Sequence, residues 1–156
     1  MLLRLLEKLN RKRIIQDRFG RDYMHRYYLC FKEKINAFDT VRPYPNIFIH
    51  KLLLSDEDRD VHDHPWNYLT VILAGGYTEW TPVFDRHGIK GGEQRTWRGP
   101  GSIIWRRATS FHRLEMSAPT WTLFIHGWRT REWGFLTKQG WIDRVEYIKD
   151  KMKLAA

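Results

Sequence analysis

The residues best suited to chemistry are two histidines one residue apart, His62 and His64, in the segment His-Asp-His-Pro-Trp. In an extended strand, residues i and i+2 point to the same side, so both imidazoles can face one point and chelate a metal ion. A third histidine from a neighbouring strand would complete a facial site of three nitrogens with positions left open for water, oxygen or substrate. His112, which follows Pro100 and Gly101, is the candidate.

The elements that must position these histidines are predicted to be strands. From Pro43 onward, short segments rich in aromatic and branched residues alternate with Pro or Gly breaks. This pattern is typical of an all-β domain, and eight strands are enough for a jelly roll. The expected strands cover residues 47–54, 66–73, 76–84, 94–97, 102–106, 110–116, 121–126 and 132–136.

Helices are expected at both ends of a single domain that covers residues 1–156. Apolar residues recur at steps of three and four from Leu2 to Tyr27, so residues 1–42 are predicted to form a basic amphipathic helical segment, broken near Gly20. Residues 43–136 are expected to form the β-barrel. The apolar spacing after Gly140 predicts a C-terminal helix within residues 137–156.

The histidine spacing resembles the two motifs of the cupin superfamily, small jelly-roll barrels with a metal at their centre. In the first motif, His62 and His64 match the paired histidines, and Gly75 or Gly76 matches the closing glycine. The positions of the opening glycine and of the glutamate differ, and hold Asp56 and either Tyr68 or Leu69.

In the second cupin motif, Gly101 and His112 match the opening glycine and the histidine. The proline, the second glycine and the asparagine of that motif are replaced by Arg107, Thr109 and Met116. The likeness covers about residues 46–128. The resemblance implies a mainly β fold, a cupin-like double-stranded β-helix, with His62, His64 and His112 as the metal ligands.

A cupin that keeps the histidines and lacks the glutamate is similar to the thiol dioxygenases and to some diketone-cleaving dioxygenases, in which three neutral imidazoles hold ferrous iron. The resemblance therefore implies Fe(II), with Zn, Ni or Mn as the other divalent metals, and a non-haem dioxygenase. Glu79, after the double glycine, is a lower-ranked candidate ligand that could replace the missing glutamate.

Three neutral histidines would leave the full charge of a divalent ion in the cavity, which favours a small anionic substrate. Arginine grips carboxylates through two parallel hydrogen bonds. Arg106, Arg107 and Arg113 are the candidates for substrate binding, within a larger group that includes Arg129 and Arg131. Tyr68 shares the parity of the histidine pair, so its phenol could act as an acid or a substrate donor, although a packed ring is the simpler interpretation.

Other polar residues are better explained without chemistry. His50 and His126 could line the cavity, but ordinary strand residues are the favoured interpretation. The acidic stretch 56–60 could accept hydrogen bonds from the imidazoles or bind a hard cation, but a solvated turn is favoured. Two functional alternatives to a dioxygenase stay open: a non-redox cupin isomerase or epimerase, and a non-enzymatic module that binds a ligand or polyanion. A metal-free pocket that retains the histidines is the main competitor to metal binding.

Composition sets the context for these hypotheses. The chain has 156 residues and is 42% apolar, enough for one core, and its lone cysteine, Cys30, indicates a reducing, cytoplasmic compartment without signal peptide or transmembrane segment. Residues 1–34 hold ten basic and four acidic residues. A solvated basic face is the favoured interpretation, ahead of a weak contact with nucleic acid or another polyanion and of membrane-surface binding. A homodimer is left open.

Overall fold

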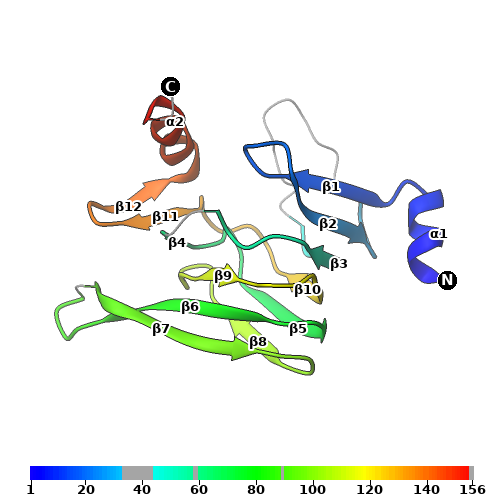
Figure 1. Ribbon diagram of the computed structural model, residues 1–156, viewed down its shortest axis with the longest axis horizontal. Coiled ribbons are helices and arrows are strands. Elements are labelled where there is room, and N and C mark those ends of the chain that lie inside the picture. The colour runs from blue at the N-terminus through cyan, green and yellow to red at the C-terminus, as the bar shows by residue number, and fades with distance from the viewer. Residues whose placement is uncertain (33–43, 58–59, 89, 155–156) are drawn as a thin grey trace.

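The computed structural model describes residues 1–32, 44–57, 60–88 and 90–154, with the backbone alone for 152–154. Antiparallel strands dominate, and a helix lies near each end (Figure 1). The helices are α1 (Leu2–Lys8) and α2 (Arg144–Leu154). The strands are β1 (Lys12–Gln16), β2 (Asp22–Tyr28), β3 (Asn46–Leu52), β4 (Val61–His62), β5 (Tyr68–Ala74), β6 (Tyr77–Phe84), β7 (Lys90–Arg98), β8 (Ile103–Arg106), β9 (Arg113–Glu115), β10 (Thr120–His126), β11 (Gly134–Thr137) and β12 (Gly140–Asp143).

The strands form one large and two small sheets. The large sheet has the order β1-β2-β3-β10-β5-β8, and the small sheets have the orders β12-β11-β4 and β7-β6-β9. A cavity lies between the large sheet and the two small ones, since its walls come from β2, β3, β5 and β10 on one side and from β4, β6 and β9 on the other. The predicted mainly β jelly roll is confirmed.

Strict alternation in the central strands creates the inner face of the large sheet. In β3, every second residue from Asn46 to Leu52 is buried, and the register with β10 places Thr122 beside His50 and Phe124 beside Phe48. Polar and aromatic residues of this inner face line the cavity, whereas an apolar cluster around Leu52 and Ile72 fills the rest of the core.

The helical prediction for residues 1–42 is wrong over most of its length. Helix α1 ends at Lys8, and the chain then forms the hairpin β1–β2, which adds to the edge of β3. Gly20 lies in the hairpin turn with φ +77°, and the Asp17 carboxylate accepts hydrogen bonds from the backbone N–H groups of Phe19 and Arg21. Residues 33–43 of this prediction lie outside the described residues.

The reason for the error is the spacing itself. Ile15, Phe19, Tyr23 and Tyr27 recur every four residues, and a step of four is close to a helical turn but is also a multiple of the two-residue repeat of a strand. The Asp-Arg-Phe-Gly sequence at 17–20 is a turn signal that favours the hairpin, because Asx turns and a left-handed glycine close short connections.

The C-terminal prediction is right about the helix and wrong about where it begins. Residues 137–143 belong to the hairpin β11–β12, and α2 begins at Arg144. Helix α2 packs on the small sheet through Tyr147, whose ring stacks on Phe135 at 4.0 Å between centroids and whose hydroxyl donates to Asp60 at 2.9 Å. Residues 155 and 156 lie outside the described part.

Several basic side chains of the N-terminal region form ion pairs within the chain. Lys12 pairs with Glu7 at 3.0 Å, Arg18 with Glu57 at 3.2 Å, and Arg21 with Asp17 at 2.6 Å. These pairs favour the interpretation of this surface as solvated and structural. Neither helix of the described chain has the length and apolar character needed to cross a bilayer.

Candidate metal centre

The three predicted histidines come together because two backbone segments form a bridge. His62 closes β4 and is paired with His112 through two hydrogen bonds, His62 N–H to His112 O at 2.8 Å and His112 N–H to His62 O at 2.9 Å. His64 follows two residues later on the same side. The ring centroids lie 4.9 Å apart for His62 and His112, 5.1 Å for His62 and His64, and 5.2 Å for His64 and His112.

Asp63, between the paired histidines, points the other way and anchors the segment. Its side chain is fully buried, and its carboxylate accepts hydrogen bonds from Gly134 N–H at 2.7 Å, from Trp141 Nε1 at 3.1 Å and from Arg131 Nη1. Gly134 has no room for a larger side chain, because a Cβ there would lie 2.0 Å from the carbonyl oxygen of Ile142. The buried carboxylate of Asp63 thus anchors the backbone between the two histidines.

The cluster has the dimensions of a metal site. One nitrogen from each of His62, His64 and His112 lies within 4.8 Å of the other two, and the Nε2 atoms of His64 and His112 are 2.9 Å apart. With metal–nitrogen bonds of about 2.1 Å, two ligands at right angles are separated by about 3.0 Å. The His64 and His112 nitrogens therefore have the separation of two adjacent corners of one coordination sphere, and a nitrogen of His62 lies within 4.8 Å of both.

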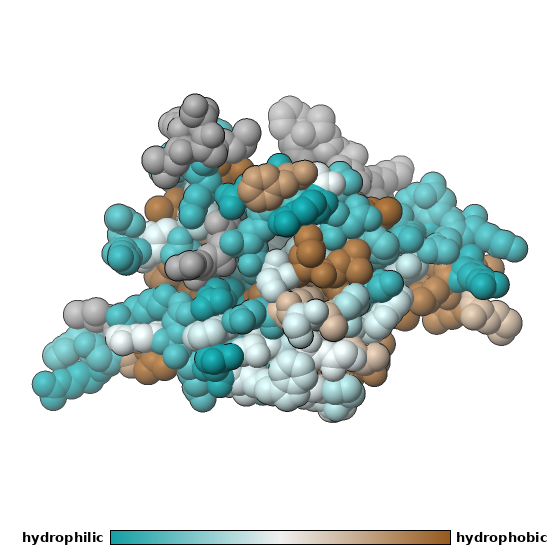
Figure 2. Space-filling view, viewed as in Figure 1, coloured by the Kyte–Doolittle hydropathy of each residue, from teal (hydrophilic) through white to brown (hydrophobic). Residues whose placement is uncertain are grey.

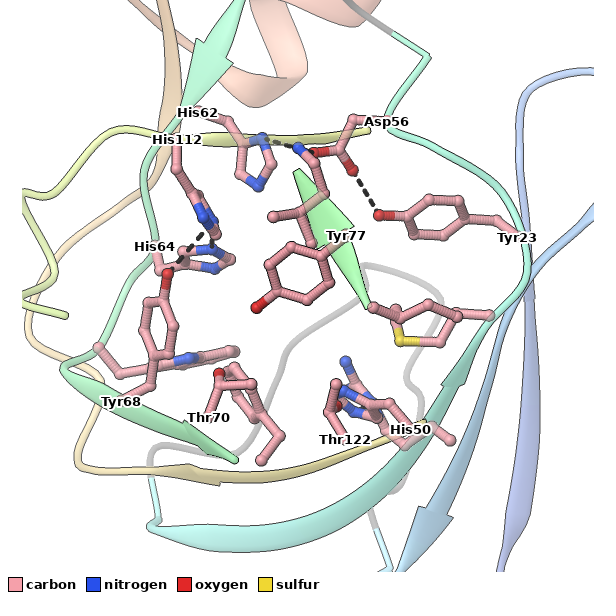
Figure 3. Close-up of a pocket in the computed structure, with 16 residues that line it drawn as sticks. Tyr23, His50, Asp56, His62, His64, Tyr68, Thr70, Tyr77, His112 and Thr122 are labelled. Atoms are coloured by element: carbon pink, nitrogen blue, oxygen red, sulfur yellow. Dashed lines mark hydrogen bonds and ion pairs between the residues drawn. The ribbon is translucent and has the colours of Figure 1, made fainter. Parts of the chain in front are cut away.

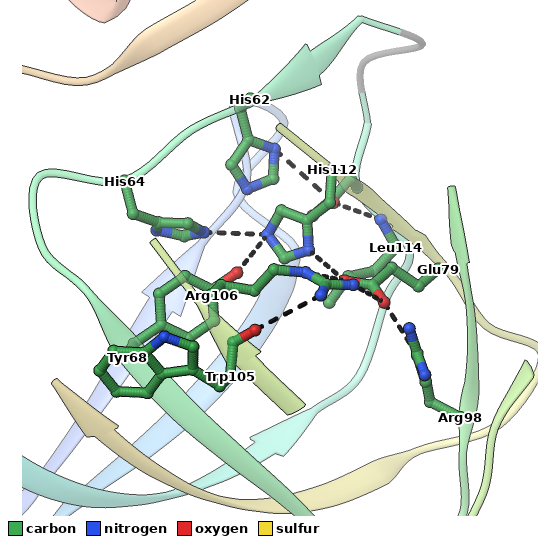
Figure 4. Close-up of polar contacts among 10 residues, drawn as sticks. His62, His64, Tyr68, Glu79, Arg98, Trp105, Arg106, His112 and Leu114 are labelled. Atoms are coloured by element: carbon green, nitrogen blue, oxygen red, sulfur yellow. Dashed lines mark hydrogen bonds and ion pairs between the residues drawn. The ribbon is translucent and has the colours of Figure 1, made fainter. Parts of the chain in front are cut away.

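The outward nitrogen of His112 is held by Glu79. The Glu79 carboxylate accepts the His112 Nδ1 hydrogen at 3.1 Å, so the Nε2 lone pair of His112 is directed toward the cavity. On the far side, Glu79 accepts from Arg98 Nε at 2.9 Å and from Arg106 Nη2 at 2.6 Å (Figure 4). Glu79 therefore lies behind His112 and contacts its outward nitrogen, and it is not in the group of three histidines whose nitrogens converge.

Electrostatics keep this network in defined charge states. Burial alone would raise the pKa of Glu79, but the hydrogen bond and charge of His112, the charge of Arg106 and the hydrogen bond from Arg98 outweigh it and bring the pKa to about 2. Burial, and then the neighbouring His62 and His112, hold the pKa of His64 well below its usual value. His64 is thus neutral at pH 7, as a metal ligand must be.

Tyr68 reaches the same centre. Its hydroxyl lies 3.2 Å from His112 Nε2, and its ring stacks on Phe124 at 5.0 Å. Burial, followed by the charge of Glu79, raises the pKa of the phenol, so it stays protonated and can donate a hydrogen bond. Tyr68 thus lies on the inner side of the sheet, whereas its neighbour Leu69 pairs with the exposed Trp105 on the outer side.

Asp56 and His50 take part in the site although simpler roles were favoured from the sequence. Asp56 lines the cavity; its carboxylate accepts from the Tyr23 hydroxyl at 2.5 Å and lies 3.8 Å from His62 Nδ1. His50 lies on the opposite wall. His126 fits the favoured interpretation better, since its ring stacks on Trp66 at 4.3 Å. Residues 58 and 59 of the acidic stretch lie outside the described part.

The cavity beside the histidines is small, and Figure 3 shows the side chains around it. The volume that the centre of a water molecule can occupy in it is about 120 Å³. Sites for drug-sized ligands measure roughly 300–1,000 Å³, so this cavity suits a ligand of few atoms. In the view of Figure 2, polar and apolar residues are mixed on the surface of the molecule.

The three predicted substrate arginines are not among the residues that line this cavity. Arg106 is turned to Glu79, Arg113 pairs with Glu93 at 3.0 Å and lies over the Trp80 ring, and Arg107 is exposed. The arginine that does line the cavity is Arg26 of β2. The sequence prediction missed it because the segment was assigned to a helix, where strand alternation could not be applied.

Tyr77 and Thr122 are further residues that the sequence did not single out. Both line the cavity, Tyr77 from the first position of β6 and Thr122 from β10. Both lie at inward-facing positions of strands that the sequence predicts, and this alternation could have identified them. The turn before Tyr77 depends on Gly75, which has φ +77° and whose added Cβ would lie 2.5 Å from the carbonyl oxygen of Pro119.

Comparison with protein-family models gives no match, and no curated protein is similar to the sequence at a significant level. Solved structures do match. The Fe(II) form of HppE, the hydroxypropylphosphonic acid epoxidase of S. wedmorenis, with (S)-1-HPP is 13% identical at a TM-score of 0.50, covering 75% of this chain and 56% of that chain. The chain thus spans little more than half the length of the epoxidase.

Two other matches have lower TM-scores. A cupin superfamily protein from Desulfitobacterium hafniense DCB-2 is 14% identical with a TM-score of 0.45, covering 72% of this chain and 82% of that chain. The DMSP lyase DddQ from Ruegeria pomeroyi DSS-3 is 17% identical with a TM-score of 0.46, covering 73% and 51%. At 13% identity the likeness to the epoxidase concerns the path of the backbone and shows the fold alone, which agrees with an antiparallel jelly roll that holds the three histidines inside.

Proposed function

We propose that this chain is a metal-dependent cupin enzyme in which His62, His64 and His112 hold one divalent first-row metal ion next to a small substrate. The observation that carries the proposal is the convergence of three imidazole nitrogens within 4.8 Å, with the outward nitrogen of His112 fixed by a buried carboxylate. Such outer hydrogen bonds orient metal-binding histidines and raise their basicity.

Iron(II) is the proposed metal, and a dioxygenase reaction is the proposed activity. Three histidines on one face leave open positions, and an iron(II) ion there would supply redox chemistry with dioxygen beside a bound substrate. The structurally similar epoxidase is itself an Fe(II) protein, which supports the choice of metal. Zinc, nickel and manganese also accept imidazole or mixed donors, so metal analysis must decide among them.

The residues of the chain would bind and orient the substrate. Neutral ligands leave the charge of the ion uncompensated, which favours an anionic substrate. The Tyr68 hydroxyl, held protonated next to His112, can donate a hydrogen bond to a negative group that approaches the centre. Trp66, Leu52 and Phe124 add apolar surface to the walls of the cavity.

The first test is metal content. The purified protein, without a histidine tag, should bind about one divalent ion per chain, and His62→Ala, His64→Ala and His112→Ala should each remove most of it, because two ligands hold a metal far less well than three. His87, in an exposed turn, is the matched control. Unchanged stoichiometry and affinity in all three variants would contradict the proposal.

A non-redox isomerase or epimerase is the second candidate, favoured by the position of Tyr68 as a buried proton donor. Oxygen uptake separates the two reactions. Protein reconstituted with Fe(II) should consume dioxygen with a short carboxylic acid that also carries a thiol or hydroxyl group. Exchange of substrate protons for deuterium by the Zn(II) form, without oxygen uptake by the Fe(II) form, would favour the isomerase. Binding without either reaction would indicate a non-enzymatic module.

Contact with a polyanion through residues 1–34 and association into a homodimer are further proposals. The ion pairs of Lys12, Arg18 and Arg21 weigh against the first, and exposed apolar residues on β5 and β8, Leu73 and Ile103 among them, support the second. Salt-dependent retention on immobilised nucleic acid and light scattering test them.

A further inference from the structure

A second and wider pocket lies beyond Glu79, on the side away from the histidines. Its volume is about 440 Å³, and its walls come from β6, β7, β8 and the turn that leads to His112. None of the described residues that line this outer pocket also lines the cavity beside the histidines. Ligand sites usually measure roughly 300–1,000 Å³, so the outer pocket can hold a larger molecule than the cavity can.

Strand pairing explains why polar side chains meet in the outer pocket. Residues that pair across β6 and β7 share a face of the sheet, and Glu79 pairs with Thr96 and Thr81 with Gln94. Arg98 follows Thr96 by two residues and therefore lies on the same face. The face that turns Glu79 toward His112 thus also contributes side chains to the outer pocket.

Two arginines in the wall of the outer pocket are fixed by one buried carboxylate (Figure 4). Glu79 accepts hydrogen bonds from Arg98 Nε at 2.9 Å and from Arg106 Nε and Nη2 at 3.2 and 2.6 Å. These bonds hold both guanidinium planes in place before any ligand binds. Because the two arginines carry two positive charges and Glu79 carries one negative charge, a positive charge remains uncompensated within this group.

The outer pocket also contains hydrogen-bond donors that have no partner among the described residues. Arg98 uses Nε for Glu79, and its two terminal nitrogens have no partner in the described part of the chain. The same is true of the side-chain hydroxyls of Thr96 and Ser110. The described lining includes no aspartate or glutamate. Such a set of donors is suited to an anion with several acceptor oxygens.

Aromatic side chains give the outer pocket an apolar part. Phe84 of β6 and Phe111 both line it, and Phe84 is 45% exposed. A ring or short chain that packs on these two side chains would remove apolar surface from water. The pocket therefore combines a site for an anionic group with a site for an organic group.

We propose that the outer pocket binds a small phosphate ester, with the phosphate on Arg98 next to the hydroxyls of Thr96 and Ser110 and the organic part against Phe84 and Phe111. A phosphate group presents three acceptor oxygens, which can engage a guanidinium and hydroxyl groups together, whereas a carboxylate presents two. This site is separate from the metal centre and does not depend on the proposed function.

The first experiment compares phenyl phosphate with benzoate, which carry the same ring and different anionic groups. The full chain is treated with a chelator, so that no metal ion can bind the phosphate, and binding is followed by calorimetry. Phenyl phosphate should bind at least about tenfold more tightly than benzoate, and in NMR spectra it should shift the backbone resonances of Thr96, Arg98 and Ser110. Equal affinities, or no binding of phenyl phosphate at millimolar concentration, would overturn the proposal.

The second experiment removes one arginine from each face of β7. Arg98→Gln should weaken phenyl phosphate binding by at least about tenfold. The matched control is Arg95→Gln, which removes the same charge from an exposed side chain on the other face, over the Trp80 ring. It should leave the affinity within about twofold at about 0.15 M salt, where distant charges are screened. Equal losses in the two variants would show a response to net charge only and would overturn the site.

A purely structural role for Arg98 gives a different result. If Arg98 only supports Glu79, then Arg98→Gln lowers the melting temperature while the affinity for phenyl phosphate stays as in the wild type, and the site is refuted. Thr96→Val and Ser110→Ala leave every charge in place, and each should weaken phenyl phosphate binding severalfold. Should Arg98→Gln fail to fold, these two variants decide, and an unchanged affinity in both would overturn the proposal.

Discussion

Replacing Glu79 by glutamine tests whether the buried network behind His112 sets the strength of the metal site. The carboxylate is 1% exposed and accepts hydrogen bonds from His112 Nδ1, Arg98 Nε and Arg106 Nη2 at 3.1, 2.9 and 2.6 Å. Glutamine keeps the shape and one carbonyl acceptor but removes the charge. The change therefore weakens several charge-assisted bonds at once without creating a cavity.

The magnitude follows from the burial of the partners. A hydrogen bond to a charged group contributes about 1.5–3 kcal/mol, and breaking a fully buried ion pair costs about 3–5 kcal/mol. The side chains of Arg98 and Arg106 are 26% and 21% exposed, so water can compensate them in part. We therefore expect Glu79→Gln to lower the free energy of unfolding by about 2–3 kcal/mol. Metal affinity should fall by at least about tenfold, since His112 loses its anionic partner.

Two measurements separate stability from metal binding. Urea unfolding of metal-free protein gives the first, and competition with a chelator gives the metal dissociation constant. Arg98→Gln is the matched control, because it removes one bond to Glu79 but does not touch His112. It should cost about 1–2 kcal/mol and leave metal affinity within about twofold. If Glu79→Gln binds metal as tightly as the wild type, the carboxylate does not act on His112.

Three further predictions use other parts of the site. Tyr68→Glu places a carboxylate beside His112 and should weaken azide binding to the metal-loaded protein by about tenfold. Leu69→Glu, on the outer side of the sheet, should leave azide binding unchanged. Equal azide affinity in the two variants would contradict the inward orientation of Tyr68. Asp63→Ala should lower the free energy of unfolding by about 3 kcal/mol and should also weaken metal binding. A loss below about 1 kcal/mol in urea unfolding would show that Asp63 does not anchor residues 62–64. Metal-free protein should lose stability as the pH falls below about 6.5, because the unfolded chain then takes up protons on histidines that stay neutral in the folded chain. Each such histidine should lower the free energy of unfolding by about 1.4 kcal/mol per pH unit. His50, whose pKa is lowered by burial and by Arg26, is one of these, so His50→Gln should reduce that slope, and an unchanged slope in urea unfolding from pH 7.5 to 5.5 would refute the assignment.

The histidine cluster was predictable because it needs only local rules. The i and i+2 positions of a strand share a side, so His62 and His64 follow from the sequence, and the motif spacing supplies His112. The eight expected strands all coincide with strands of the structure, although several boundaries move by a few residues. The short strand β4 was missed, because two residues are too few to show alternation.

The part of the cavity wall that β2 forms was not predictable in the same way. Its position depends on which strands lie side by side, and β2 joins the sheet next to β3 rather than packing as a helix outside it. Arg26 enters the cavity only through that pairing. Likewise, the sequence shows Glu79 near the double glycine, but its contact with His112 arises because β6 pairs with β9, the strand that begins immediately after His112.

Arginines lie on both sides of the histidine cluster, two of them outside the cavity and one along its wall. Arg98 and Arg106 lie behind Glu79, outside the cavity, and keep its carboxylate charged next to His112. Arg26 lines the cavity from β2, and its charge contributes, after burial and the neighbouring His62 and His112, to the lowered pKa of His64. The missing motif glutamate fits this arrangement. A carboxylate at Tyr68 would bring a negative charge to the metal and compete with an anionic substrate, whereas a protonated phenol adds a donor and leaves the charge to the ligand that enters.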